Sequence, residues 1–221
     1  ATRPPNVVVI MSDQHRFDVM GNAGHPVVKT PHMDRLAAEG VTFSRSYCQG
    51  PLCMPARASF LTERYVRDHL IFDNLHNIEP DTTPTFLHAL STAGYHTTCV
   101  GKMHFYRHDL GETGTSLLGD STANHADDLR ALGFTEPLET VGKLASGSVD
   151  CEYTDYLDDI GLLGTYRDWI ALRRYSNQEI DGKTVEAKKL WETGPVPLPH
   201  EAYMDAWHGR RAERWIDEYD R

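Results

Sequence analysis

The sequence of 221 residues lacks several features that would place it in common classes of protein. It has only 4 cysteines, and no two of them form a Cys-x-x-Cys pair: Cys48, Cys53, Cys99 and Cys151. Cysteines this few and this scattered do not make a disulfide framework, and a structural zinc site is not expected. No apolar run approaches the roughly 18 residues of a membrane-spanning helix, so the sequence predicts no transmembrane segment.

Positive charge is also scarce. The chain has 22 lysines and arginines against 32 aspartates and glutamates, a formal net charge of −10. Nucleic acids and anionic membranes attract basic surfaces, so neither is expected as the main partner. An anionic substrate would therefore have to be met by a local cluster of positive side chains.

Strand-like and helix-like segments alternate along the first half of the chain. We expect strands at residues 6–11, 41–47 and 97–100, and helices at residues 30–39, 55–61 and 83–93. The first strand, Asn-Val-Val-Val-Ile-Met, is a short β-branched run of the kind that is buried on both faces of a parallel sheet. The pattern predicts an α/β fold, a mostly parallel sheet flanked by helices.

The second half of the chain has a different pattern of predicted elements. We expect a long excursion over residues 111–147 with a short helix at 126–132, a helix within 156–175, and a proline-rich connector at 194–199. Residues 200–219 predict an amphipathic helix with Tyr203, Trp207, Trp215, Ile216 and Tyr219 on one side. This divides the chain into a core (1–110), an insertion region (111–199) and a final helix (200–221).

Polar residues follow two of the predicted strands. Asp13 and Gln14 come after the first strand, and Lys102 and His104 after the strand at 97–100. Ligands of open α/β sheets bind at the carboxyl ends of strands. Lys102 and His104 are two residues apart, so on an extended strand end their side chains point the same way. Taken alone, Asp13 also suits a turn or a helix N-cap.

The segment from Cys53 to Arg57, Cys-Met-Pro-Ala-Arg, is the most informative. A cysteine at a helix N-terminus with an arginine four residues later would be favoured as the thiolate. For a lone cysteine the alternatives are a buried structural residue or an ordinary thiol nucleophile, although no Cys-His-Asn arrangement is apparent.

In its context, Cys-x-Pro-x-Arg resembles the signature of the type I sulfatases, members of the alkaline phosphatase superfamily. Three further segments resemble family motifs in the same order: residues 7–14, residues 30–40 (TPHMDRLAAEG), and Gly94-Tyr95 followed by Gly101-Lys102-Met103-His104. The match is dense over residues 6–105 and sparse over 110–190. The resemblance implies an alkaline phosphatase-like sulfatase domain, of which this chain would be the N-terminal part.

The resemblance also implies a nucleophile. In this family the motif cysteine, here Cys53, is oxidised by a separate formylglycine-generating enzyme to formylglycine. The hydrated aldehyde attacks sulfur through one hydroxyl, forming a covalent sulfo-enzyme, and its second hydroxyl then expels sulfate. Asp13 matches a metal ligand, and Gln14 either a metal ligand or a substrate contact. With the modified Cys53 they imply a hard divalent cation, Ca²⁺ first, with Mg²⁺ or Mn²⁺ as alternatives.

The resemblance also implies roles for four more residues. Arg57 would hold the nucleophile by charged hydrogen bonds, Lys102 would bind a sulfate oxygen, and His104 would act as the base for sulfate release. Asn74 matches a substrate-side asparagine of the choline sulfatase and phosphonate monoester hydrolase branches, with a turn residue as the alternative.

The chain departs from the family pattern at two positions. Glu63 and Leu70 replace glycines, so we expect the local turns to differ. The remaining metal ligands, a leaving-group histidine and a second lysine would come from beyond residue 221. His125, His200 and His208 are not assigned to these roles: we expect His200 at a helix start and His208 on a solvated helix face.

The sequence thus predicts a sulfuric ester hydrolase that acts on a small-molecule sulfate ester. A phosphonate monoester or phosphodiester hydrolase of the same superfamily, and a non-catalytic family member, are the alternatives. The strand-like start at Val7 leaves no room for a signal peptide, which favours a cytoplasmic location over a secreted or periplasmic one. A homo-oligomer is left open.

Overall fold

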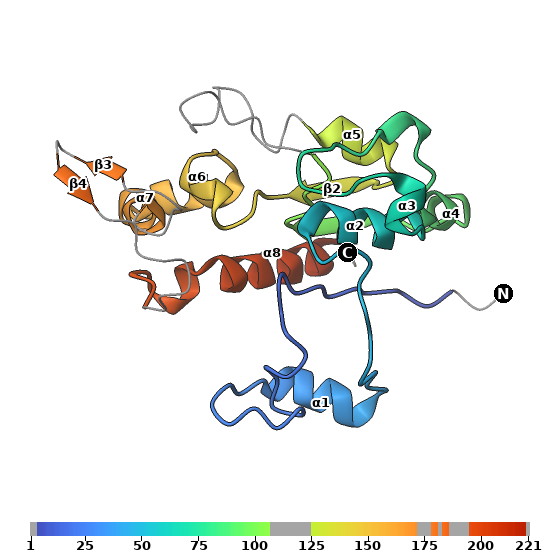
Figure 1. Cartoon of the computed structure of the whole chain (residues 1–221), viewed down its shortest axis with the longest axis horizontal. Helices are drawn as coiled ribbons and strands as arrows, with labels where there is room; N and C mark the ends of the chain where they lie inside the picture. The colour runs from blue at the N-terminus through green and yellow to red at the C-terminus, as the bar shows by residue number, and fades with distance from the viewer. Residues whose placement is uncertain (1–3, 107–124, 172–177, 181–182, 186–194, 220–221) are drawn as a thin grey trace. The chain divides into compact units, whose positions relative to one another are not determined.

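The computed structural model describes residues 4–106, 125–171, 178–180, 183–185 and 195–219 (Figure 1). The chain divides into two compact units, a first unit of residues 1–48 and a second unit of residues 49–221. Each unit is described by itself. No helix among the described residues is long and apolar enough to cross a membrane.

Helix α1 (Pro31–Glu39) organises the first unit. It begins with a proline and is followed by Gly40, as the sequence predicts. Asp34, in its first turn, accepts hydrogen bonds from the Thr30 hydroxyl and the Asn22 amide, both at 2.8 Å. A Cβ at Gly21 would lie 2.2 Å from the Asp34 carboxylate, so only glycine lets the preceding loop close onto this helix.

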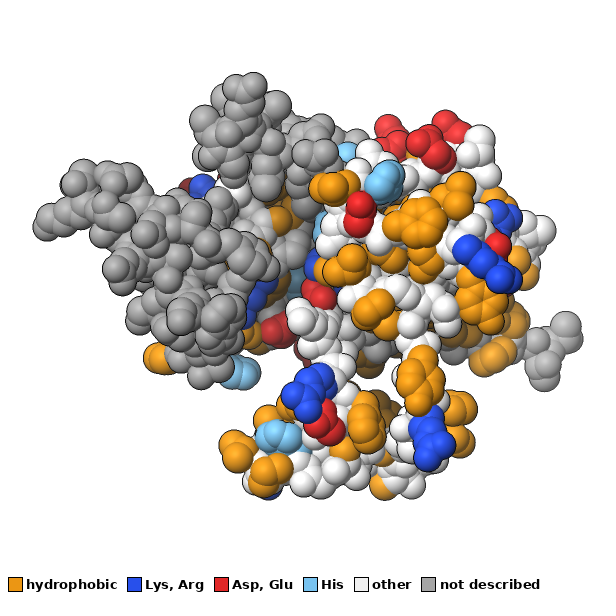
Figure 2. All heavy atoms as spheres, in the orientation of Figure 1, with side chains coloured by type: hydrophobic (Ala, Val, Ile, Leu, Met, Phe, Trp, Pro, Cys, Tyr) orange, Lys and Arg blue, Asp and Glu red, His pale blue; other side chains and the backbone are white. Residues whose placement is uncertain are grey.

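The prediction of strands at residues 6–11 and 41–47 is wrong, because neither segment is a strand. Their apolar side chains are exposed, with Val8 at 74%, Ile10 at 85% and Val41 at 80%. Figure 2 shows hydrophobic side chains at the molecular surface. A strand forms only where neighbouring strands bind its amides and carbonyls, and the described part of the first unit has none.

The second unit begins with helices and one parallel strand pair. Its first elements are α2 (Cys53–Thr62), α3 (Val66–His69), the 3₁₀ turn η1 (Pro80–Thr82), α4 (Phe86–Thr92), β1 (Thr98–Gly101), α5 (Ala126–Ala131) and β2 (Glu136–Glu139). β1 and β2 pair in parallel, with Thr98 opposite Glu136 and Gly101 opposite Glu139. The predicted parallel α/β arrangement is therefore present here, and the helix predicted at 126–132 is confirmed as α5.

β2 was not predicted, because its sequence, Glu-Pro-Leu-Glu, has no β-branched residue and contains a proline. The helix predicted from Thr83 begins at Phe86 instead, because Thr85 is the N-cap and forms a capping box with His88. Gly94 follows this helix at φ 85°, which suits its predicted place at the helix end.

The rest of the second unit is mainly helical. It contains η3 (Ala145–Gly147), α6 (Glu152–Asp159), α7 (Leu163–Ala171), the antiparallel strands β3 (Gln178–Ile180) and β4 (Lys183–Val185), η4 (His200–Ala202) and α8 (Met204–Tyr219). The single helix predicted within 156–175 is two helices, separated at Gly161, where φ is 70°. The predicted helix at 200–219 is a 3₁₀ turn followed by α8, which packs against β1 (Figure 1).

Two hydrophobic cores hold the second unit together. The first lies among α2, α4, β1 and α5 and consists of Met54, Ala58, Leu61, Ile71, Ile78, Leu87, Cys99, Phe105, Tyr106, Leu129, Leu132 and Phe134. The second joins α6, α7 and the start of α8 through Val141, Val149, Cys151, Tyr153, Leu157, Tyr166, Ile170, Ala202 and Met204. The first core buries one face of α2 and so fixes the helix that begins at Cys53.

Glu63 and Leu70 both adopt the left-handed conformation, at φ 58° and 62°, and cap α2 and α3. Both positions thus have a backbone conformation that favours glycine but are occupied by residues with a Cβ. The left-handed region costs such residues about 1 kcal/mol or more.

Changing Glu63 or Leu70 to glycine should therefore stabilise the protein by roughly 0.5–1 kcal/mol each. Both side chains are exposed, so little packing is lost. Ala93, the exposed C-cap of α4 at φ −79°, is the matched control, and Ala93→Gly should destabilise. Urea unfolding of the three variants measures the difference, and a loss of stability in both Glu63→Gly and Leu70→Gly would contradict the strain argument.

Candidate active site

Cys53 is the first residue of α2, at the positive end of the helix dipole. The residue before it, Leu52, has no side chain that can cap the exposed amides. The cap comes instead from Asn74, whose Oδ1 accepts a hydrogen bond from the Met54 amide at 2.9 Å. Asn74 thus holds the backbone directly after Cys53 in place.

Asn74→Ala should cost roughly 0.5–2 kcal/mol of unfolding free energy, because a part-buried amide of α2 loses its acceptor. Asn74→Asp keeps the acceptor oxygen and should retain most of the stability. Thermal unfolding of the two variants checks this. Equal melting temperatures for Asn74→Ala and the parent would remove Asn74 as the cap.

Lys102 and Arg57 connect α2 to the end of β1. The Lys102 ammonium Nζ lies 3.4 Å from the Cys53 Sγ. Arg57, one turn after Cys53 on the same helix, donates from Nη1 to the Lys102 carbonyl oxygen at 2.6 Å. The ammonium of Lys102 and the N-terminus of α2 thus meet at Cys53, in a chain whose net charge is −10.

The segment from Lys102 to His104, called the Lys102–His104 turn below, has no regular secondary structure. This corrects the prediction of an extended strand end. β1 ends at Gly101, where φ is 101°, and His104 is also left-handed, at φ 53°. A non-glycine residue in this region is uncommon and is held there by its surroundings. Here the amides of Met103 and His104 donate to one carboxylate oxygen of Glu139, at 3.1 and 2.8 Å.

Glu139 is the residue of this site that the sequence did not reveal. It is the last residue of β2, and its side chain is buried. Burial raises the pKa of Glu139 above its ordinary value, while the two amide hydrogen bonds and the nearby His125 and Arg57 act in the opposite direction. No motif marked Glu139, because β2 itself was not foreseen.

The structure therefore brings Cys53, Arg57, Asn74 and Lys102 together in the second unit, with His104 two residues after Lys102. Asp13 and Gln14 belong to the first unit, in an exposed segment where Gln14 has φ 21°. Their carboxylate and amide oxygens suit a hard cation such as Ca²⁺. No group of three or more histidine, cysteine, aspartate or glutamate side chains among the described residues could hold a metal.

Two of the histidines outside the motifs, His208 and His125, have structural partners. The prediction of a solvated helix face for His208 is wrong. His208 packs over Gly101, and its Nε2 lies 2.7 Å from the Thr140 hydroxyl. Burial lowers the pKa of His208. His125 stacks on Tyr106 with ring centroids 4.8 Å apart, and His200 begins η4, as predicted.

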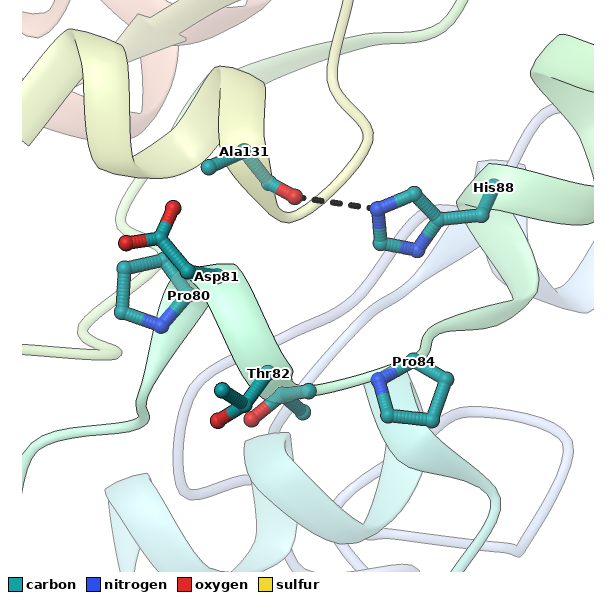
Figure 3. A pocket seen from close by; sticks show the side chains of 7 residues that line it. Pro80, Asp81, Thr82, Pro84, His88 and Ala131 are labelled. Carbon is teal, nitrogen blue, oxygen red and sulfur yellow. Dashed lines mark hydrogen bonds between the residues drawn. The ribbon is translucent and has the colours of Figure 1, made fainter.

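A surface hollow of about 430 Å³ lies between η1, the start of α4 and the end of α5 (Figure 3). It is lined by Pro80, Asp81, Thr82, Thr83, Pro84, His88 and Ala131. Both ring nitrogens of His88 are engaged: Nδ1 accepts from the Thr85 amide and Nε2 bonds the Ala131 carbonyl at 2.9 Å. The hollow shares no residue with the Cys53 site, and its histidine serves the fold.

Comparison with known proteins gives a consistent result. A family model described as Sulfatase matches residues 5–178. The chain is 39% identical to an arylsulfatase of Clostridium perfringens over 46% of this chain and 21% of that protein. It is 30% identical to human N-acetylgalactosamine-6-sulfatase over 85% of this chain and 34% of that protein. It is 35% identical to a choline-sulfatase of Rhizobium meliloti over 47% of this chain and 20% of that protein.

The chain spans about a fifth to a third of the length of these relatives. The matched region nevertheless contains Cys53, Arg57, Lys102 and His104 and covers most of this chain. The sequence motifs and the parallel β1–β2 pair agree with that match. The chain belongs to the sulfatase family.

Proposed function

We propose that the natural polypeptide carrying this chain hydrolyses a sulfate monoester, with residue 53 as its nucleophile. The observation that carries the proposal is the 3.4 Å approach of the Lys102 ammonium to the Cys53 sulfur at the N-terminus of α2. An anionic ester entering a protein of net charge −10 needs such a local positive cluster. The sulfatases named above support this choice of substrate class.

Formylglycine made from Cys53 by a maturation enzyme would supply a hydroxyl nucleophile at this position. The other residues act around it. Lys102 binds a sulfate oxygen and stabilises the charge that develops on it. Arg57 holds the Lys102 carbonyl, and so the turn that carries the ammonium. His104 accepts a proton during sulfate release.

A divalent cation, Ca²⁺ or alternatively Mg²⁺ or Mn²⁺, would offset further charge on the sulfate group. Asp13 and Gln14 are the ligands that we assign to it in this chain. Asp13→Asn should lower the bound metal measured by elemental analysis of the purified protein. Asp18→Asn, in the same unit but paired with Arg16 at 2.5 Å, is the control and should leave the metal content unchanged. Equal metal content in Asp13→Asn and the parent would remove Asp13 as a ligand.

The function is tested by comparing hydrolysis of an aryl sulfate with that of an aryl phosphodiester. A sulfatase should prefer the aryl sulfate, and a preference for the phosphodiester would favour a hydrolase of the same superfamily with another substrate. A mass spectrum of the Cys53 peptide after co-expression with the maturation enzyme should show a loss of about 18 Da, from thiol to aldehyde. Turnover by a protein whose Cys53 is entirely an unmodified thiol would overturn the formylglycine assignment.

A further inference from the structure

Glu139 is a buried acidic residue outside every motif of the sequence. It is only 8% exposed, and one of its carboxylate oxygens accepts the amides of both Met103 and His104. A buried carboxyl group is unfavourable unless its hydrogen-bonding capacity is used. Here that capacity is used on the backbone of the turn that carries two proposed catalytic side chains.

The turn needs an acceptor at this place. The Met103 and His104 amides both point to the same side of the backbone, where they bind the Glu139 oxygen. Without that oxygen two part-buried amides would have lost their partner, and the left-handed conformation of His104 would have lost its support. Glu139 therefore compensates the strain at His104.

The neighbouring residues place Glu139 beside the turn. Glu139 is opposite Gly101 in the β1–β2 register, and the next amide, of Thr140, donates to the Gly101 carbonyl at 3.0 Å. A Cβ at Gly142 would lie 3.1 Å from the Lys102 stem, so this glycine leaves room for the lysine. Arg57 holds the Lys102 carbonyl from the α2 side. The turn is thus fixed from two directions.

We propose that Glu139 is a positioning residue of the active site, which holds the Lys102–His104 turn so that the ammonium of Lys102 stays at Cys53. Its action is through the backbone, because one Glu139 carboxylate oxygen accepts the amides of Met103 and His104. The expected effect of Glu139 on kcat/KM rests on the proposed function. Its expected effect on the backbone of residues 102–104 does not.

The first experiment reads the turn directly, by amide hydrogen exchange measured by NMR on the purified chain. Glu139→Met fills the same space but accepts no hydrogen bond, and should speed the exchange of the Met103 and His104 amides roughly tenfold or more. Glu139→Gln keeps a carbonyl oxygen and should leave both amides protected. Glu139→Asp, which is one methylene shorter, should behave like Glu139→Met.

Glu136→Gln is the matched control, because Glu136 is on the same strand but binds Trp215 and His96 instead. It should leave the exchange of the Met103 and His104 amides unchanged. Unchanged exchange in both Glu139→Met and Glu139→Asp would overturn the proposal. If Glu139→Met does not fold, Glu139→Asp and Glu139→Gln still decide it.

The second experiment is a double-mutant cycle in the natural polypeptide, with aryl sulfate as substrate. Glu139→Met should lower kcat/KM by about 10²-fold, and Glu139→Gln should restore it to within a few-fold. On a Lys102→Ala background the same Glu139→Met change should cost much less, because the group it positions is already missing. Equal losses on both backgrounds would mean a merely structural role and would overturn the proposal.

The two experiments also separate this inference from the function. A parent protein that shows no aryl sulfate turnover refutes the proposed function, while the exchange data still test whether Glu139 holds the turn. Accelerated exchange together with turnover that depends on both Glu139 and Lys102 supports both.

Discussion

Cys53→Ala is expected to abolish hydrolysis of the sulfate ester, with a loss of about 10⁴-fold or more in kcat. Helix α2 should be retained, because alanine has the highest helix propensity. The substitution removes only the side chain that lies next to Lys102. Lys102, the proposed sulfate-binding group, remains, and Arg57 still holds its carbonyl. The loss should therefore fall on kcat far more than on KM.

The control is Cys48→Ala, which removes an exposed cysteine five residues earlier. This change should leave turnover within about twofold, as surface substitutions usually do. Cys53→Ser should be almost as inactive as Cys53→Ala, because one hydroxyl can attack sulfur but cannot then expel sulfate by forming an aldehyde. Substantial turnover by Cys53→Ala would rule out residue 53 as the nucleophile.

His104→Asn should give a burst of alcohol product, near one per active site, followed by turnover slowed by about 10²–10⁴-fold. In the proposed mechanism the burst arises because the first attack on sulfur needs Lys102 and the nucleophile, whereas release of sulfate needs the base. Asparagine is the right replacement, because it tolerates the left-handed conformation found at φ 53°. Rapid-quench measurement of alcohol and sulfate separates the two steps.

Two comparisons sharpen the test of His104. His104→Gly also tolerates the backbone conformation, and added imidazole should restore part of its turnover if the missing group is a base. Lys102→Ala should slow the first step and show no burst, because the contact to the sulfate is lost from the outset. A His104→Asn protein that loses activity without a burst would place the role of His104 in the first step.

The sequence alone determined the parts of this site that are local in the chain. Cys53 and Arg57 are four residues apart on one short helix, so their shared face follows from helix geometry. Helices α1, α2 and α5, and strand β1, follow from proline, glycine and apolar spacing within a few residues. Lys102 and His104 were found for the same reason, because they follow the end of a strand that its own composition predicts.

The tertiary structure decided what depends on partners far along the chain. The apolar segment at residues 6–11 has strand composition, but a strand also needs neighbours, and none pairs with it among the described residues. β2 has poor strand composition, yet pairing with β1 makes it a strand. Strand propensity contributes less than backbone pairing with a neighbouring strand, so a prediction from propensity was wrong for both segments.

The same reason explains Asn74 and Glu139. Asn74 caps a helix 20 residues earlier in the chain, and Glu139 binds amides that precede it by 36 and 35 residues. The resemblance named Asn74 only for a substrate-side role and did not name Glu139. The backbone contacts of both residues left no trace in the sequence, because only folding brings donor and acceptor together. The sequence thus predicted which residues carry the proposed chemistry, and the tertiary structure decided which residues hold the backbone around them in place.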